Sequence, residues 1–119
     1  MFRYFNANEF GYDIEDCTIR AISVAEGISW DKAYRKLSDY ARERGLMISS
    51  VESIEEYLDD NYCRLCIPDM TVGEFAYDNP YGTFLITMPG HISVIKDGEI
   101  IDTFDCSERI MWCAWYVKD

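Results

Sequence analysis

The sequence feature that most constrains the fold is the pair Asp97-Gly98, which stands between two segments rich in β-branched residues. Asp-Gly is a strong signal for a two-residue hairpin turn, and such a turn fixes which residues face each other across the strands. We therefore expect residues 91–95 and 99–104 to form an antiparallel hairpin. Residues 83–88 and the apolar run 110–117 have the composition of two further strands. The C-terminal third is thus predicted to be an antiparallel meander.

Helical patterns precede this region, after an N-terminal arm that we expect to be irregular. Four helices are predicted from capping residues and apolar spacing. Their boundary signals are Asp16 and Gly27, Ser29 and Gly45, a Ser49/Glu52 capping box, and a Thr71/Glu74 capping box before Asn79-Pro80. In the third helix we expect Val51, Ile54, Tyr57 and Leu58 to face inward. This order indicates an α+β fold, with N-terminal helices packed on a C-terminal antiparallel sheet.

The composition favours one folded unit. The 119 residues suffice to bury a core, and 49% of them are hydrophobic and 15% aromatic, which excludes a disordered chain. We find no internal repeat or linker, so we expect a single domain over residues 1–119. The apolar runs are far shorter than the roughly 20 residues of a membrane span, and the N-terminus has no apolar stretch of signal-peptide length. We expect a soluble, cytoplasmic protein that binds no membrane.

Charge and cysteine content narrow the function further. With 11 basic and 22 acidic residues the net charge is −11, which argues against nucleic-acid binding because that requires Lys and Arg on phosphates. The charge fits a solvated acidic surface or the steering of basic partners. Five cysteines without an export signal suggest reduced thiols. Cys63 and Cys66 form one C-x-x-C, but no second close pair completes a zinc set, and Cys106 and Cys113 are poorly spaced for one. We expect no metal or other cofactor.

The only histidine, His91, begins the predicted hairpin. Counted outward from the turn, His91 faces Phe104 and Ser93 faces Asp102, so His91, Ser93 and Asp102 share one face. Diagonal neighbours on a face lie about 7–8 Å apart at Cα, within reach of an imidazole and a carboxylate. A one-residue slip would exchange Asp102 for Asp105, because successive side chains point to opposite faces. Asp102 is the predicted partner of His91, with Asp105 as the alternative.

Cys17 stands at the predicted start of the first helix, in EDCTIRAISVAEG. A cysteine attacks as a thiolate, a nearby imidazole takes and returns its proton, and a carboxylate fixes the tautomer of that imidazole. A helix N-terminus adds partial positive charge and a backbone N–H for an oxyanion. Cys17, His91 and Asp102 therefore form a candidate catalytic triad. The alternative is that Cys17 is a core residue, since cysteine is among the most buried residue types.

Three acidic residues just upstream, Asp13, Glu15 and Asp16, oppose this activation because negative charge favours the neutral thiol. A helix terminus contributes only about 0.3–1 kcal/mol at exposed sites. One nearby carboxylate offsets this contribution of the helix terminus. Two unit charges about 4 Å apart interact by roughly 4 kcal/mol at an effective dielectric constant near 20. Activation must therefore come mainly from a close contact between Cys17 and His91.

These segments resemble small papain-like cysteine peptidases. DCTIRAISVAEGISWDKAYRKL is similar to the segment in which a cysteine opens the central helix, and GHISVIKDGEIIDTFDCS to the paired strands that carry His and then Asp. The D-C-x-x-R-A-I start, TVGEFAYDNPYGTFLITMPGH and the D-G-x-x-x-D-T ending also resemble a group of short phage and bacterial proteins, over about residues 10–107. Bacteriocin-leader peptidases and cell-wall NlpC/P60 peptidases are similar in the Asp-Cys helix start and the later His strand.

The resemblance implies a papain-like fold over the whole domain, with Cys17 as nucleophile, His91 as general base and acid, and Asp102 as the residue that orients His91. Papain-like enzymes place a Gln a few residues before the cysteine to bind the oxyanion, and this chain contains no Gln. Asn6 and Asn8 are the candidates to replace it, because an amide N–H is what that site requires. Their spacing differs from that of the family.

Three functional hypotheses follow. The first is a papain-like thiol hydrolase that cleaves a peptide or isopeptide bond of a peptide or protein substrate through a Cys17 thioester. The second is a non-catalytic acidic interaction protein, such as a phage-encoded inhibitor that occupies a basic surface of a host protein. The third is a purely structural α+β domain. The missing Gln and the charge of −11 favour the second, and the conjunction of Cys17, His91 and Asp102 favours the first. The sequence defines neither a specificity pocket nor an oligomeric state.

Overall fold

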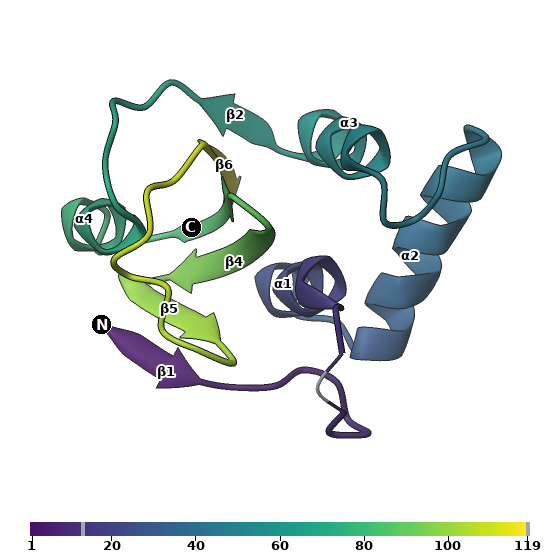
Figure 1. Ribbon diagram of the computed structural model, residues 1–119, viewed down its shortest axis with the longest axis horizontal. Coiled ribbons are helices and arrows are strands. Elements are labelled where there is room, and N and C mark those ends of the chain that lie inside the picture. The colour runs from purple at the N-terminus through teal and green to yellow at the C-terminus, as the bar shows by residue number, and fades with distance from the viewer. Residues whose placement is uncertain (13, 119) are drawn as a thin grey trace.

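A six-stranded mixed sheet organises this computed structural model, which describes residues 1–12 and 14–118 (Figure 1). The strand order is β1-β5-β4-β3-β6-β2. In chain order the elements are β1 Phe2–Tyr4, α1 Cys17–Glu26, α2 Trp30–Glu43, α3 Val51–Asn61, β2 Cys63–Leu65, α4 Val72–Asp78, β3 Thr83–Met88, β4 His91–Lys96, β5 Glu99–Asp102 and β6 Cys113–Lys118. The four helices of this part of the chain, mostly N-terminal, pack on the sheet in an α+β fold. None of them has the length and apolar character needed to cross a membrane.

The two faces of the sheet bury two sets of apolar side chains. α1 lies on one face, against β4, β3 and β5, while α2 packs against α1 and α3 against α2 (Figure 1). Ile92, Val94 and Ile101 contribute to the core on this face. Ile95 and Ile100, at the alternating positions, contribute to the core on the other face, where α4 lies. Burial on both faces explains why the strands are almost continuously apolar.

The hairpin forms in the predicted register. The β4–β5 partners are Lys96 and Glu99, Ile95 and Ile100, and Val94 and Ile101. Asp97 and Gly98 both have positive φ, 50° and 76°, as a type I′ turn requires. Gly98 is also packed closely, since a Cβ there would come within 3.3 Å of Pro80 Cα. β5 ends at Asp102 rather than at residue 104, because the Thr103 N–H donates to Asp102 Oδ1 at 2.7 Å instead of to a neighbouring strand.

The sheet differs from the prediction at both edges and at the start of its last strand. β1 forms within the arm that was expected to be irregular, and it runs parallel to β5, so the sheet is mixed rather than antiparallel. β2, which was not predicted, pairs antiparallel with β6. Both strands have three residues, too few to show a period of two. β6 begins at Cys113 rather than at residue 110, because Ile110 and Met111 pair with Thr71 and Met70 before α4.

Most helix boundaries follow their sequence signals, and those of α3 do not. Those that agree are Gly27 after α1, Ser29 before α2, Gly45 beyond its end, and the Thr71/Glu74 capping box of α4. α3 is capped by Ser50, whose Oγ accepts from the Ser53 N–H at 3.1 Å, and not by the predicted Ser49/Glu52 pair. The Ser50 N–H closes a turn on the Met47 carbonyl, which delays the helix by one residue. Val51, predicted to face inward, is 67% exposed on the first turn.

Candidate functional site

The first residue of α1, the first of β4 and the last of β5 meet in space, and they are Cys17, His91 and Asp102. The hairpin register brings His91 and Asp102 to the same face of neighbouring strands. Packing of α1 on β4 then places the helix start over the start of that strand. The structure therefore brings together all three residues of the candidate triad.

Hydrogen bonds link the three side chains in series. His91 Nε2 lies 2.7 Å from Asp102 Oδ2. This contact leaves Nδ1 as the ring nitrogen for the hydrogen bond between His91 and the Cys17 sulfur. Asp102 is itself held in place, since its Oδ2 accepts from Ser93 Oγ at 2.6 Å and its Oδ1 from the Thr103 N–H at 2.7 Å. The carboxylate thus orients the imidazole so that its second nitrogen faces the thiol.

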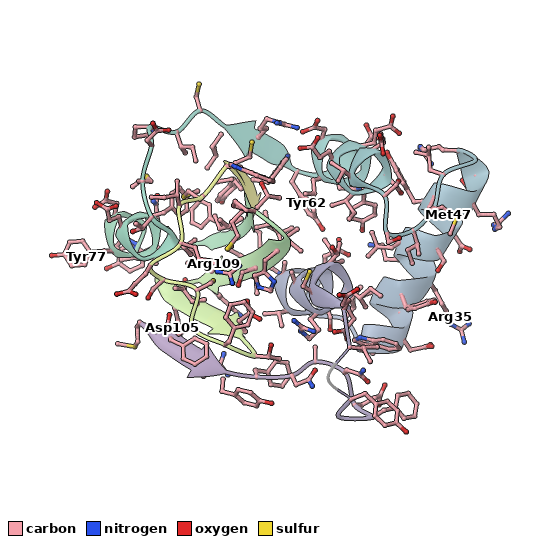
Figure 2. All side chains as sticks on the ribbon, in the orientation of Figure 1. Arg35, Met47, Tyr62, Tyr77, Asp105 and Arg109 are labelled. Carbon is pink, nitrogen blue, oxygen red and sulfur yellow. The ribbon has the colours of Figure 1, made fainter. Side chains whose placement is uncertain are left out.

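Asp105, the alternative partner of His91, is placed elsewhere. It lies beyond the end of β5 and is exposed (Figure 2). Its carboxylate accepts from the Ser107 N–H at 3.0 Å within the same loop. The turn at residues 97–98 fixes the register that selects Asp102, because a slip of one residue would reverse every side chain.

Burial and hydrogen bonding act in opposite directions on the ionisable groups of the site. Burial raises the pKa of the Cys17 thiol, but hydrogen bonds from His91 and the Ile92 backbone, and the charges of His91 and Arg20, bring it below its ordinary value. Burial lowers the pKa of His91, yet its hydrogen bonds with Asp102 and Cys17 raise it to about 9. Burial raises the pKa of Asp102, and hydrogen bonds led by that from His91 bring it below its usual range. These shifts favour the ion pair of a Cys17 thiolate and a His91 imidazolium relative to the neutral pair.

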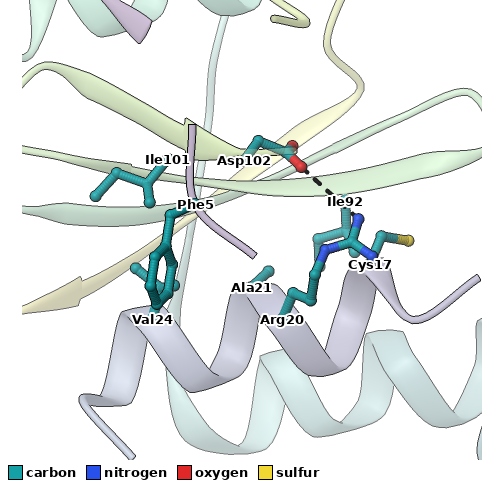
Figure 3. A pocket seen from close by; sticks show the side chains of 8 residues that line it. All are labelled: Phe5, Cys17, Arg20, Ala21, Val24, Ile92, Ile101 and Asp102. Carbon is teal, nitrogen blue, oxygen red and sulfur yellow. Dashed lines mark ion pairs between the residues drawn. The ribbon is translucent and has the colours of Figure 1, made fainter. Parts of the chain in front are cut away.

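Arg20, which the sequence patterns did not single out, completes the site. It lies one turn after Cys17 on α1, and its side chain is only 11% exposed. Its guanidinium bonds to the Asp16 carboxylate and lies 3.7 Å from Asp102 Oδ1 (Figure 3). The positive charge favours the Cys17 thiolate. The signal that could have identified it is the four-residue spacing of Asp16 and Arg20, which places the two side chains on one face of a helix.

The acidic flank before Cys17 is partly neutralised. Asp16 occupies the N-cap position of α1, but its side chain caps no backbone N–H, contrary to the prediction. It accepts instead from Arg20 and from Trp30 Nε1, the latter at 2.8 Å. Glu15 is exposed, and Asp13 lies outside the described residues. The ion pair with Arg20 therefore offsets the repulsion that was expected from Asp16.

An aromatic ring covers the imidazole. The ring centroids of Phe104 and His91 are 4.7 Å apart, and the Arg109 guanidinium lies 5.1 Å from the centre of the Phe104 ring. The side chains of His91 and Asp102 are only 6% and 4% exposed. Exclusion of water strengthens the hydrogen bond between them, because the local dielectric constant is lower than in solvent.

The two asparagines predicted to bind an oxyanion are not brought to Cys17. Asn6 Oδ1 accepts from the Asn8 N–H, and Asn8 Oδ1 accepts from the Phe10 N–H, both at 3.0 Å. These local turns fold the arm on itself, and neither side chain lines the cleft at Cys17. The backbone N–H of Cys17, at a helix start that Asp16 leaves uncapped, remains as the donor for that role.

The cleft at Cys17 is small. It lies between α1 and β5 and has a volume of about 10 Å³ (Figure 3). Arg20, Val24, Ile101 and Phe5 are among its lining residues. Such a volume holds about one water molecule, so the cleft alone does not accommodate a peptide side chain.

A group of potential metal ligands overlaps the site. The ligand atoms of His91, Asp102 and Cys106 lie within 4.8 Å of one another, an arrangement that the sequence did not suggest. Burial raises the pKa of the Cys106 thiol to about 11. A metal binds thiolate rather than thiol, and His91 and Asp102 are bonded to each other, so the arrangement favours proton transfer over metal binding. Cys63 and Cys66 are exposed, and neither belongs to a comparable group within residues 1–12 and 14–118.

Within the described ranges, Cys17, His91 and Asp102 are the group in which a thiol, an imidazole and a carboxylate are joined in series by hydrogen bonds. Such a series is the arrangement that activates a cysteine nucleophile. Its function has to be inferred from this geometry. No protein-family model, curated protein or solved structure matches this chain.

Proposed function

We propose that the protein is a thiol hydrolase of papain-like fold that cleaves a peptide or isopeptide bond through Cys17. The observation that carries the proposal is the hydrogen-bonded series from the Cys17 sulfur through His91 to Asp102. The lowered pKa of Cys17 supports its role as nucleophile. The papain-like assignment is supported by the order of the parts, in which a cysteine opens a helix packed on antiparallel strands that carry first the histidine and then the aspartate.

In the proposed reaction the Cys17 thiolate attacks the carbonyl carbon of the scissile amide, and a C–S bond forms as the carbonyl oxygen becomes an oxyanion. The His91 imidazolium donates its proton to the leaving nitrogen, the C–N bond breaks, and a Cys17 thioester remains. Water then attacks the thioester while His91 takes a proton from it. Release of the acid product returns the thiolate and the imidazolium. Asp102 stays ionised throughout and stabilises the charged ring.

The oxyanion of this reaction would lie against the Cys17 backbone N–H at the start of α1, where the helix dipole also favours negative charge. Among the described residues, none with a side-chain amide lines the cleft at Cys17. Loss of one oxyanion donor costs about 10²–10³-fold in turnover. We therefore expect a slow hydrolase, because formation and hydrolysis of the thioester both pass through a tetrahedral oxyanion.

Thiol-selective alkylation tests this function. Each cysteine is modified with iodoacetamide across a wide pH range and quantified by mass spectrometry. Cys17 is expected to react at a lower pH than the exposed Cys63 and Cys66, because the hydrogen bond and charge of His91 lower the pKa of Cys17. His91→Ala should abolish this difference. Asp102→Asn should weaken it, and Asp105→Asn, the matched control on the neighbouring loop, should leave it unchanged.

The pH dependence of turnover adds a second readout. Departure of the amine requires a protonated His91, so hydrolysis of a susceptible peptide should decline as the pH rises above about 9. If Cys17 reacts no faster than the exposed thiols and its reaction does not depend on His91, Cys17 is not a nucleophile and the proposal is wrong.

A non-catalytic interaction protein is the second candidate, and two observations favour it. The cleft beside Cys17 holds about one water molecule and has no amide side chain in it, while the net charge of −11 suits a basic partner. Under this function Cys17→Ala would leave binding to the partner unchanged. Loss of the biological effect in both Cys17→Ala and His91→Ala would exclude a non-catalytic function.

A further inference from the structure

A second, larger hollow lies next to the cleft at Cys17. Its volume is about 260 Å³, and it is open to solvent. Phe5, Val24 and Ile101 line both the cleft and the hollow. In Figure 3 the Phe5 ring points towards Val24 of α1. The hollow therefore adjoins the candidate active site, with which it shares these three lining residues.

The hollow exists because the sheet extends past the helix that covers it. α1 packs on β4, β3 and β5, whereas β1 lies beyond β5 at the edge of the sheet (Figure 1). Arg3 pairs with Ile101, whose side chain belongs to the core on the α1 side, so Arg3 and Phe5 project to that same side of β1. The space beneath them, beside the end of α1, is left uncovered.

The lining of the hollow selects an apolar occupant. Phe5, Val24, Ile28 and Ile101 supply apolar surface. The polar group inside it is already satisfied, because Ser23 Oγ donates to the Ile28 carbonyl at 2.6 Å. A polar or charged side chain would lose its water there without gaining a partner, which disfavours its binding.

The rim of the hollow carries one charge pair. Arg3 Nε donates to Glu99 Oε1 at 2.8 Å, and the Arg3 side chain is 54% exposed. A guanidinium has five N–H donors, so others remain to bond carbonyl oxygens of a chain lying across the opening. An apolar interior with the Arg3 guanidinium at its rim fits an extended peptide.

We propose that this hollow binds one large apolar side chain of the peptide or protein that Cys17 cleaves. The proposal rests on the proposed function and gives it a substrate class. Val24 lies seven residues after Cys17 on α1, which corresponds to about 10 Å along a helix. An extended peptide covers that distance in about three residues. The substrate should therefore carry Leu, Ile, Met or Phe about three residues from the scissile bond.

Quenched fluorescent peptides that differ at a single residue test this proposal. One series carries Leu at the third position on either side of the scissile bond, and a matched series carries Asn, which has a similar size and is polar. We expect kcat/KM to be at least about tenfold higher for a Leu peptide, a typical discrimination by an apolar pocket. Val24→Trp and Ile28→Trp, which fill the hollow, should remove the preference. Val51→Trp adds the same side chain at an exposed and remote position and should leave it intact.

Two measurements separate failure of this inference from failure of the proposed function. Iodoacetamide is too small to use the hollow, so the alkylation profile of Cys17 reports on the triad alone. A normal profile together with equal cleavage of Leu and Asn peptides would overturn the hollow and leave the hydrolase in place. Binding of the labelled peptides to Cys17→Ala, followed by fluorescence anisotropy, needs no turnover. Tighter binding of the Leu peptide that is lost in Val24→Trp supports the hollow, and equal binding of both peptides overturns it.

Discussion

At the scale of single residues, the Arg20 guanidinium stands between two buried carboxylates, those of Asp16 and Asp102, close to the Cys17 thiol. Without this charge, both carboxylates would act on the thiol from nearby and favour its protonated form. Arg suits the position because a planar guanidinium bonds several oxygens at once and keeps its charge when buried. The charge balance of the site is therefore set within one turn of α1.

Substitution of Arg20 tests this balance. Arg20→Ala is expected to raise the pKa of Cys17 and to lower the free energy of unfolding by about 3 kcal/mol, because it leaves a buried carboxylate unpaired. Arg20→Lys keeps a positive charge, so the alkylation profile of Cys17 should change less. Alkylation across pH and urea unfolding provide the readouts. Arg35→Ala, which breaks an exposed ion pair with Asp31, is the control and should cost less than about 1 kcal/mol. An unchanged Cys17 profile in Arg20→Ala would contradict this role.

At the scale of elements, features set by neighbouring residues were predictable from the sequence. Features set by contacts between residues far apart in the sequence were not. The Asp97-Gly98 turn fixes its register through two backbone angles, so the pairing of His91 with Asp102 followed from the sequence. The role of Asp16 did not follow from the sequence, because its carboxylate accepts a hydrogen bond from Trp30, which lies on the next helix. β1 and β2 were missed for a related reason, since three-residue strands are specified by partners far along the chain rather than by their own pattern.

Three helices are joined at Glu26, the last residue of α1. Its carboxylate accepts from Lys36 of α2, from Tyr57 of α3 at 2.9 Å, and from Tyr62, which follows α3. Burial raises the pKa of the Glu26 carboxyl, but these hydrogen bonds bring it below its ordinary value. A carboxyl whose pKa is lower in the folded than in the unfolded protein stabilises the fold when the pH is above the unfolded-state pKa. This stabilisation is lost as the pH falls through the folded-state pKa.

Glu26→Gln is therefore expected to lower the free energy of unfolding at neutral pH by roughly 1–3 kcal/mol. It should also flatten the loss of stability that sets in as the pH falls below the ordinary pKa of a glutamate, about 4.3, because the carboxyl that takes up a proton in the wild type is absent. Thermal unfolding at a series of pH values measures both effects. Glu43→Gln, an exposed change at the end of α2, should stay within about 0.5 kcal/mol of wild type. Parallel pH curves for Glu26→Gln and wild type would show that Glu26 does not join the helices in this way.

At the scale of the whole molecule, one sheet serves two cores. β3 and β4 send alternate side chains to the α1 side and to the α4 side. The change from helical to strand periodicity made the α+β class predictable. The placement of β1 beside β5 was not predictable, because it depends on the pairing of residues 2–4 with residues 100–102, which are far away in the sequence. That placement also creates the hollow beside the candidate site.

The shared sheet implies that the two cores unfold together, as the prediction of a single domain requires. Ile22 lies in the core on the α1 side and Ile86 in the core on the α4 side, and both are 0% exposed. Ile22→Ala and Ile86→Ala should each lower the free energy of unfolding by about 2–5 kcal/mol. Both should shift the same urea transition, with far-UV circular dichroism and tryptophan fluorescence coinciding. Val51→Ala, an exposed control, should shift it little. Two separate transitions, each sensitive to only one of the core variants, would show instead that the sheet does not couple the cores, and the site at Cys17 would then depend on the α1 side alone.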